Sequence, residues 1–132
     1  AGLVGCEVAM FLAEKGKNVT VLDMLPDVAP DMPIYTKWVL KSKLAELHIS
    51  VKTNNKIIAM SGTKVQCETE NGNQEYHADA VVCALGLKSN RTLLEQLRAE
   101  CKDLEIIPVG DVNSPRKIMQ ATHEGFHAAR RI

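Results

Sequence analysis

Two glycines and an aspartate near the start of the chain have the residue types and spacing of a dinucleotide-binding motif. The G-x-G-x-x-G pattern follows a strand, opens a helix and is completed by an Asp or Glu about 20 residues later. Gly2 and Gly5 have the spacing of its second and third glycines, and Asp23 follows downstream. The first glycine and its strand, which should be the central one of the sheet, would precede residue 1. We therefore interpret the motif as cut rather than degenerate.

The chemistry of this motif depends on the start of the helix. A helix N-terminus carries unpaired N–H groups and a partial positive charge, and a residue without Cβ lets a pyrophosphate approach them. Gly2 would allow that approach, Leu3 and Val4 would lie at the same cofactor contact, and Gly5 would permit tight packing of helix on strand. Ordinary packing glycines are the alternative interpretation.

Asp23 would select the form of the nicotinamide cofactor. At the end of its strand, a carboxylate can accept hydrogen bonds from the ribose hydroxyls of adenosine, which points to NADH rather than NADPH. A 2′-phosphate would meet like charge there, and no Arg or Lys occurs between Asp23 and Lys37 to offset it. A solvated loop aspartate is the alternative.

Two further acidic positions are candidate contacts. Glu7 is expected on the first turn of the opening helix, where a carboxylate interacts favourably with the helix dipole, either as a ligand contact or as a structural cap. Gly110-Asp111, between a predicted strand and a predicted helix, places a carboxylate acceptor beside backbone donors, which suits a polyol. An ordinary Asp-containing turn explains the same residues.

Residues 123–127, His-Glu-Gly-Phe-His, match the letters of the H-E-x-x-H zinc motif. A zinc hydrolase needs a third ligand downstream, yet only five residues follow, and no other part of the sequence offers an obvious one. The small residues around it fit a cofactor contact better, so we expect no metal site. The four cysteines form no C-x-x-C pair, which favours reduced thiols in a cytoplasmic protein.

The composition of the chain indicates which class of partner it binds. The 132 residues are 45% hydrophobic, enough for one globular core, and the 16 basic residues balance the 16 acidic ones. This balance favours a small, specifically held ligand over nucleic acid or an anionic membrane surface. The sequence contains no run of about 20 apolar residues, which a membrane-spanning helix would need. We expect a piece of a larger cytoplasmic protein.

Periodicity predicts the elements that position these residues. Helices are expected at residues 3–15, with Val4, Val8, Phe11 and Leu12 as the apolar face, and at 33–48, with Leu40, Leu44 and Leu47 extended by Ile34 and Trp38. Short β-branched runs predict strands at 19–23 and 49–53, which gives the alternation of a parallel, doubly wound sheet. Residues 56–60, 63–69 and 74–77, separated by glycine turns, predict an antiparallel meander.

The rest of the chain returns to the parallel pattern. The apolar run 80–85, ended by Gly86, predicts a central parallel strand with its carboxyl end at a ligand crevice. A helix at 92–101, a strand at 105–109 and a helix at 115–132 with a buried face of small residues should follow. The predicted fold class is α/β: a Rossmann-like doubly wound parallel sheet with an antiparallel three-stranded β-meander, truncated at its first strand.

Four segments together resemble a known family. Residues 2–9, 19–26, 81–90 and above all 109–129 are similar to the C-terminal region of NADH:flavin oxidoreductases of the 2,4-dienoyl-CoA reductase and enoate reductase type. The resemblance implies an N-terminal TIM barrel with FMN and an iron–sulfur cluster, then an FAD domain with an NAD(P)H domain inserted in it. Residues 1–100 would be the NAD(P)H-binding domain lacking its first strand, and residues 101–132 the returning segment of the FAD-binding domain.

The resemblance also implies roles for particular residues. Gly2, Gly5, Glu7, Asp23 and Gly86 would contact the nicotinamide cofactor. Gly110 and Asp111 would hold the ribityl and pyrophosphate region of FAD, and the N-terminus of the helix beginning near Arg116 would face the flavin. The implied function is passage of hydride from NADH to FAD for reduction of an enoyl-type substrate elsewhere in the parent protein. With the upstream FAD and TIM-barrel domains missing, the fragment alone should be inactive. A non-catalytic NAD(H)-sensing module is the alternative.

Overall fold

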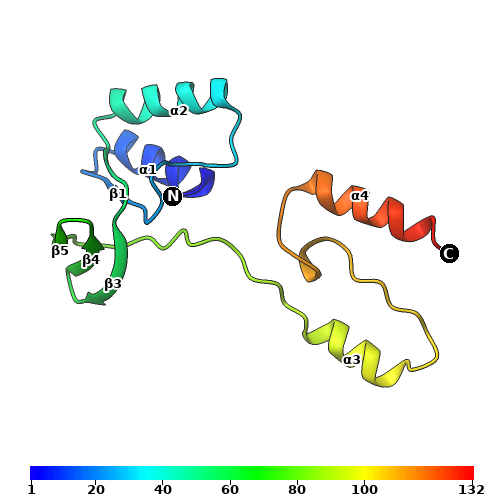
Figure 1. Ribbon diagram of the computed structural model, residues 1–132. Coiled ribbons are helices and arrows are strands. Elements are labelled where there is room, and N and C mark those ends of the chain that lie inside the picture. Colours follow the sequence, from blue (N-terminus) through cyan, green and yellow to red (C-terminus); the bar gives the residue numbers. More distant parts are fainter. The chain divides into compact units, whose positions relative to one another are not determined.

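A computed structural model describes all 132 residues (Figure 1). Their contacts divide the chain into two compact units, Ala1–Leu85 and Gly86–Ile132. Ten elements occur along the chain: in the first unit four helices and strands lead into a three-stranded β-meander, and the other three elements belong to the second unit. No helix is long and apolar enough to cross a membrane.

The first unit opens with the predicted alternation of helix and strand. Its elements are α1 (Leu3–Glu14), β1 (Thr20–Leu22), α2 (Ile34–Glu46) and β2 (Ser50–Lys52). The two strands pair in parallel, with Thr20 opposite Ser50 and Leu22 opposite Lys52. A parallel pair needs a crossover connection, and α2 supplies it. The α/β class is therefore confirmed, with a parallel sheet of two strands.

The buried face of α1 differs from the predicted one. Cys6 and Ala9 are its buried residues, whereas Val4 and Phe11 are 67% and 58% exposed. Because α1 is apolar around most of its circumference, hydrophobic spacing could not single out one face. Small side chains determine which face of α1 is buried, since they let the helix approach the sheet closely.

The predicted apolar stripe of α2 is correct only in its second half. Leu40 and Leu44 are buried in one core with Cys6, Val21 and other residues of α1, β1 and the following loop. Ile34 and Trp38, by contrast, are 65% and 70% exposed. The sheet has no further strand for the first turns of α2 to cover, so these side chains remain in solvent.

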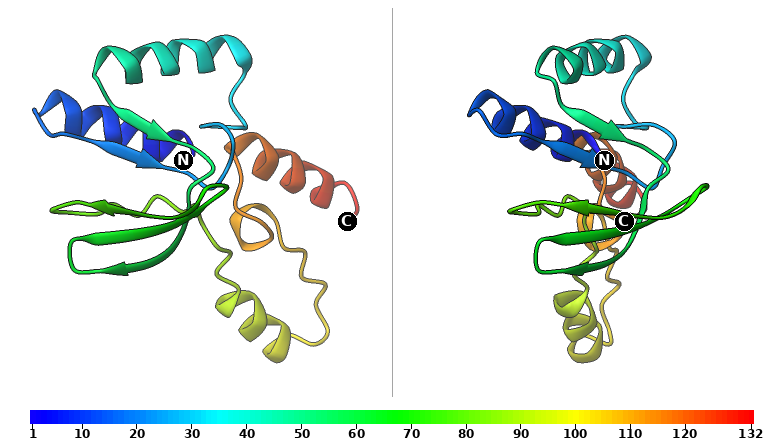
Figure 2. Two further views of the ribbon diagram at one scale, coloured as in Figure 1. Left: turned by 60° about the vertical axis from the view of Figure 1, so that its left-hand side comes forward. Right: turned by 90° about the vertical axis from the view of Figure 1, so that its left-hand side faces the viewer.

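A three-stranded antiparallel meander follows, as predicted (Figure 2). It consists of β3 (Lys56–Ser61), β4 (Lys64–Thr69) and β5 (Gly72–His77), with β4 in the centre. Two-residue loops join the strands, because Ser61 pairs with Lys64 and Thr69 with Gly72. On β4, Val65 and Cys67 point to the buried side in strict alternation with exposed neighbours.

The prediction of a strand at residues 80–85 is wrong for this structure. Residues 78–91 form neither helix nor strand, and Val82 and Leu85 are 60% and 86% exposed. A parallel strand obtains its hydrogen bonds only from neighbouring strands, and the sheet contains only β1 and β2. The apolar run 80–85 thus has the composition of a central strand, but it lacks the neighbouring strands with which a strand would pair.

The second unit contains α3 (Thr92–Glu100), the short 3-10 helix η1 (Gly110–Val112) and α4 (Ile118–Ala129). The predicted strand at residues 105–109 is absent, because these residues pair with no strand and Pro108 has no N–H to donate. The last helix begins at Ile118 rather than near Arg116. No residue of α4 is fully buried, so its small-residue face is only partly covered.

Candidate functional site

Residues 1–5 form the N-terminal glycine turn, where α1 begins. Gly2 is the N-cap residue, with an extended backbone, and its carbonyl accepts the N–H of Cys6 at 3.2 Å. No side chain caps α1, and its first turn contains no acidic residue. The N–H groups of Leu3, Val4 and Gly5 therefore remain available to an external acceptor. A Cβ added to Gly2 would have no heavy atom within 4 Å, so the space beside these donors is open.

Gly5 has a different role from Gly2. A Cβ at Gly5 would lie 3.2 Å from the Cβ atoms of both Ala1 and Ala84. This close approach agrees with the predicted packing role of the third motif glycine. It also places residue 84 of the apolar run 80–85 against α1, although that run forms no strand.

Asp23 lies beside the N-terminal glycine turn, directly after β1. Its side chain is 8% exposed, so the alternative of a solvated loop aspartate is wrong. Oδ1 accepts the N–H of Leu25 at 2.9 Å, and Oδ2 contacts the amino group of Ala1. The structure thus brings Asp23 to Ala1 of the N-terminal glycine turn.

The loop after β1 folds back over the same turn. The N–H of Ala29 donates to the Ala1 carbonyl at 2.8 Å, and Val28 and Ala29 are buried. Asp27 contacts Lys41 of α2, with Oδ1 and Nζ 2.7 Å apart, and the hydrogen bond from Lys41 is the main cause that lowers the Asp27 pKa. This loop therefore ties α2 to the start of α1.

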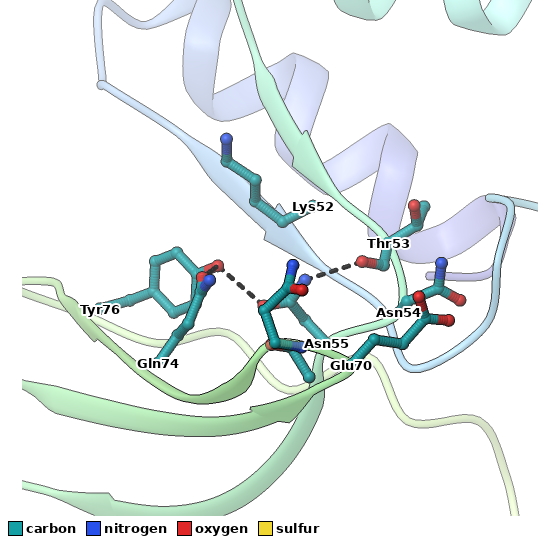
Figure 3. A pocket seen from close by; sticks show the side chains of 9 residues that line it. Lys52, Thr53, Asn54, Asn55, Glu70, Gln74 and Tyr76 are labelled. Carbon is teal, nitrogen blue, oxygen red and sulfur yellow. Dashed lines mark hydrogen bonds between the residues drawn. The ribbon is translucent and has the colours of Figure 1, made fainter.

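A polar depression of about 410 Å³ lies between the end of β2 and the meander (Figure 3). Asn55 is buried at its base, accepts the Tyr76 hydroxyl at 2.7 Å and donates to the Thr53 carbonyl at the same distance. The backbone N–H of Asn55 also donates to the Asp23 carbonyl at 2.8 Å. The meander is thereby connected to the position of Asp23, a link that the sequence did not indicate.

Glu7 does not occupy the predicted place at the helix dipole. It is the fifth residue of α1, beyond the first turn, and its side chain is exposed. The helix starts at Leu3, as predicted, but its first turn ends before Glu7, and dipole effects fall off within one turn. Its neighbour Cys6 is fully buried, and burial is the main cause that raises the pKa of this thiol.

Residues 110–113 form the C-terminal glycine turn, which includes η1. Gly110 is buried with φ +67°, and a Cβ there would lie 3.3 Å from the Cβ of Ala121 on α4. The carbonyl of Gly110 accepts the N–H groups of Asn113 and Ser114, both at 3.0 Å. Asp111 is exposed, and its carboxylate makes no hydrogen bond or ion pair. The turn thus presents a free carboxylate on a closely packed backbone.

Glu124 of α4 holds this turn, and sequence reasoning missed it. Its Oε2 accepts the Gly110 N–H at 2.7 Å, while its Oε1 contacts Arg116 Nη2 and lies 3.4 Å from Asn113 Nδ2. Glu124 lies in the His-Glu-Gly-Phe-His run, which sequence reasoning considered only as a possible zinc motif. His123 and His127 are exposed, and no group of three metal-ligating side chains occurs in the structure.

The predicted site residues therefore fall into two groups. Gly2, Leu3, Val4, Gly5 and Asp23 come together in the first unit. The second unit joins Gly110, Asp111 and Arg116 at the C-terminal glycine turn. Gly86 also belongs to the second unit, where it is exposed with φ +87° and open space around it. Arg116 directly precedes Lys117, the N-cap residue of α4, and its guanidinium contacts Glu124.

Comparisons with known proteins give this geometry a context. The family model described as pyridine nucleotide-disulphide oxidoreductase matches residues 1–121. The NADH oxidase of Thermoanaerobacter brockii is 33% identical over 132 residues, covering 99% of this chain and 20% of the relative. The bilirubin reductase of Mediterraneibacter gnavus is 32% identical over 129 residues, covering 97% and 20%.

One solved structure is similar to nearly the whole chain. A 2-naphthoyl-CoA reductase complex superimposes with a TM-score of 0.82 at 26% identity, over 99% of this chain and 20% of that protein. The chain thus spans about a fifth of the length of the proteins it matches. The resemblance to flavin oxidoreductases of the 2,4-dienoyl-CoA reductase type is confirmed by these matches.

Proposed function

Because the chain belongs to the pyridine nucleotide-disulphide oxidoreductase family, we propose that it is the nicotinamide-dinucleotide-binding part of a flavoprotein oxidoreductase. Its first unit binds NADH, and its second unit contributes to a flavin site. In the parent protein, hydride from NADH reaches FAD and serves to reduce an enoyl-type substrate. Residues 1–100 would be the NAD(P)H-binding domain and residues 101–132 the returning segment of the FAD-binding domain.

The N-terminal glycine turn carries this proposal. Three free N–H groups at the start of α1, open space at Gly2 and an adjacent buried carboxylate are the features that a dinucleotide needs. The N–H groups of Leu3, Val4 and Gly5 would hold the pyrophosphate. Glu7 and Gly86 are exposed and remain candidate contacts to the rest of the cofactor.

Asp23 gives the preference for NADH. The buried carboxylate would accept the ribose hydroxyls, and it would repel a 2′-phosphate. Lys37 and Lys41 are the first cations that follow Asp23 along the chain, but both contact Asp27. They are therefore engaged by another acid.

The flavin contact rests on the C-terminal glycine turn. Asp111 is free to accept hydrogen bonds from a polyol, and the close packing of Gly110 on Ala121 holds the backbone beside it. Bound flavin would supply the redox chemistry, and the residues of this chain would supply position and charge. FMN, an iron–sulfur cluster and a TIM-barrel domain would belong to other parts of the parent protein, which we expect to be cytoplasmic.

A non-catalytic NAD(H)-sensing module is the second candidate. It would use the N-terminal glycine turn in the same way, with binding shifting a conformational equilibrium. The free Asp111 on a fixed turn disfavours it, because a sensor has no use for a polyol site. Binding of NADH without any affinity for FAD would favour the sensor.

Isothermal titration of the chain with NADH and NADPH tests the proposal. We expect NADH to bind at least about tenfold more tightly, and Asp23→Asn to reduce that ratio, since hydrogen bonds to a charged group contribute about 1.5–3 kcal/mol. Gly2→Ala should weaken NADH binding by blocking the pyrophosphate. Gly125→Ala, which also adds a Cβ in open space, is the matched control. Equal affinity for NADPH, or unchanged NADH binding by Gly2→Ala, would contradict the proposal.

A further inference from the structure

Glu124 connects the two ends of the C-terminal glycine turn from a separate element. One carboxylate oxygen accepts the N–H of Gly110, where the turn begins, at 2.7 Å. The other contacts the guanidinium of Arg116 and lies 3.4 Å from the side-chain amide of Asn113, where the turn ends. The side chain is 23% exposed, so these hydrogen bonds are largely shielded from water.

The far side of the turn is fixed as well. The Asn113 carbonyl accepts Arg91 Nη2 at 3.0 Å and Ser89 Oγ at 3.3 Å, which joins the turn to the residues just before α3. Gly110 packs on Ala121, one helical turn before Glu124. Gly110 before Asp111 and Asn113 after it are therefore restrained, while the Asp111 carboxylate itself has no partner.

A carboxylate that served only to stabilise α4 would contact its own helix. Glu124 instead contacts the backbone N–H of a glycine 14 positions away. It also pairs with Arg116, so this cation is engaged by Glu124. The Asp111 carboxylate is left without a partner.

We propose that Glu124 is a positioning residue that fixes the conformation of the C-terminal glycine turn and so presents Asp111 to the flavin without touching it. The flavin part of this inference rests on the proposed function. The part that concerns the turn is a property of the chain alone.

Two readouts separate these parts: the hydrogen-exchange rate of the Gly110 amide in this chain, followed by NMR, and the affinity of the parent protein for FAD, corrected for the folded fraction. Glu124→Gln keeps the size of the side chain and one acceptor, whereas Glu124→Ala removes every contact. Loss of a hydrogen bond to a charged acceptor predicts Gly110 exchange about 10- to 100-fold faster in Glu124→Ala. FAD affinity should fall by a similar factor, and Glu124→Gln should lie between wild type and Ala.

Glu100→Gln and Glu100→Ala are the matched controls, because Glu100 is an exposed acid at the end of α3 in the same unit. They should change neither readout. Unchanged Gly110 exchange in Glu124→Ala would overturn the inference outright. Faster exchange with unchanged FAD affinity would overturn the positioning role and leave a structural one. A wild-type parent protein that binds no FAD would instead refute the flavin part of the proposed function, with Gly110 exchange still deciding whether Glu124 fixes the turn.

Discussion

At the N-terminal glycine turn the glycine faces open space and the acid is buried, whereas at the C-terminal glycine turn the glycine is buried and the acid is exposed. Gly2 has an extended backbone that any residue can adopt, so its value lies in the space beside it. Gly110 has φ +67° and a close neighbour, so its value lies in the conformation itself. A glycine and an aspartate therefore leave backbone N–H donors free in the first unit and a carboxylate free in the second unit.

Gly110→Val should have the largest effect, because it adds strain and crowding at the same position. A β-branched residue in the left-handed region and a Cβ close to Ala121 together predict a loss of about 2–5 kcal/mol in the free energy of unfolding of the second unit. Chemical denaturation followed by hydrogen exchange measures it. Gly16→Val, with φ +76° and open space, is the control for strain alone. Equal losses in both variants would show that packing on Ala121 contributes nothing.

Gly5→Val and Gly2→Val should separate stability from binding within the N-terminal glycine turn. Gly5→Val crowds Ala1 and Ala84 and should cost about 1–3 kcal/mol of folding free energy. Gly2→Val meets open space and should leave the melting temperature almost unchanged while NADH affinity falls. Thermal unfolding and titration of both variants test this. Comparable destabilisation by the two variants would remove the distinction between the glycines.

Tyr76→Phe tests whether the meander supports the position of Asp23. Removing the hydroxyl leaves the buried Asn55 carbonyl oxygen without its partner, which should cost about 1–3 kcal/mol. The backbone amide hydrogen of Asn55, which is donated to the Asp23 carbonyl, should then exchange with solvent faster. Tyr35→Phe, at a residue 84% exposed, is the control and should have no effect. Unchanged protection of the Asn55 amide would contradict the link.

Lys41→Met should have the smallest effect, and one that depends on pH. Lys41 is the main cause of the lowered Asp27 pKa, so the pair stabilises the fold above the unfolded value of about 3.9 and loses that contribution as pH falls through the lower folded value. The stability difference from wild type should be greatest above about pH 5 and vanish in stronger acid. Lys43→Met, which removes an exposed pair with Glu46, is the control. A difference independent of pH would point to packing rather than charge.

Local chemistry made much of the fold predictable. The four helices, the hairpins of the meander and the parallel pairing of β1 with β2 follow from short-range spacing, glycine turns and the alternation of elements. The predictions of strands at residues 80–85 and 105–109 were wrong, because a strand forms only where neighbouring strands supply its hydrogen bonds. Glu7 was misplaced although the helix start was predicted correctly, because it is the fifth residue of α1 and the favourable dipole position is confined to the first turn.

The candidate site was predictable where its residues belong to one continuous motif. Gly2, Gly5 and Asp23 lie within 22 residues and are joined by one helix and one strand. Glu124 was missed because its role depends on a contact with Gly110, which spacing along α4 cannot show. The face of α1 was missed because an almost wholly apolar helix has no unique apolar side.

The exposed first turns of α2 have a practical consequence for optical work. Trp38 is the only tryptophan of the chain and is 70% exposed. Its emission already comes from an indole in water in the native state, so unfolding should shift the emission maximum very little. The same indole should respond strongly, by a blue shift and by loss of iodide quenching, when another surface covers α2. Intrinsic fluorescence of this protein therefore reports contact at α2 rather than folding of the core.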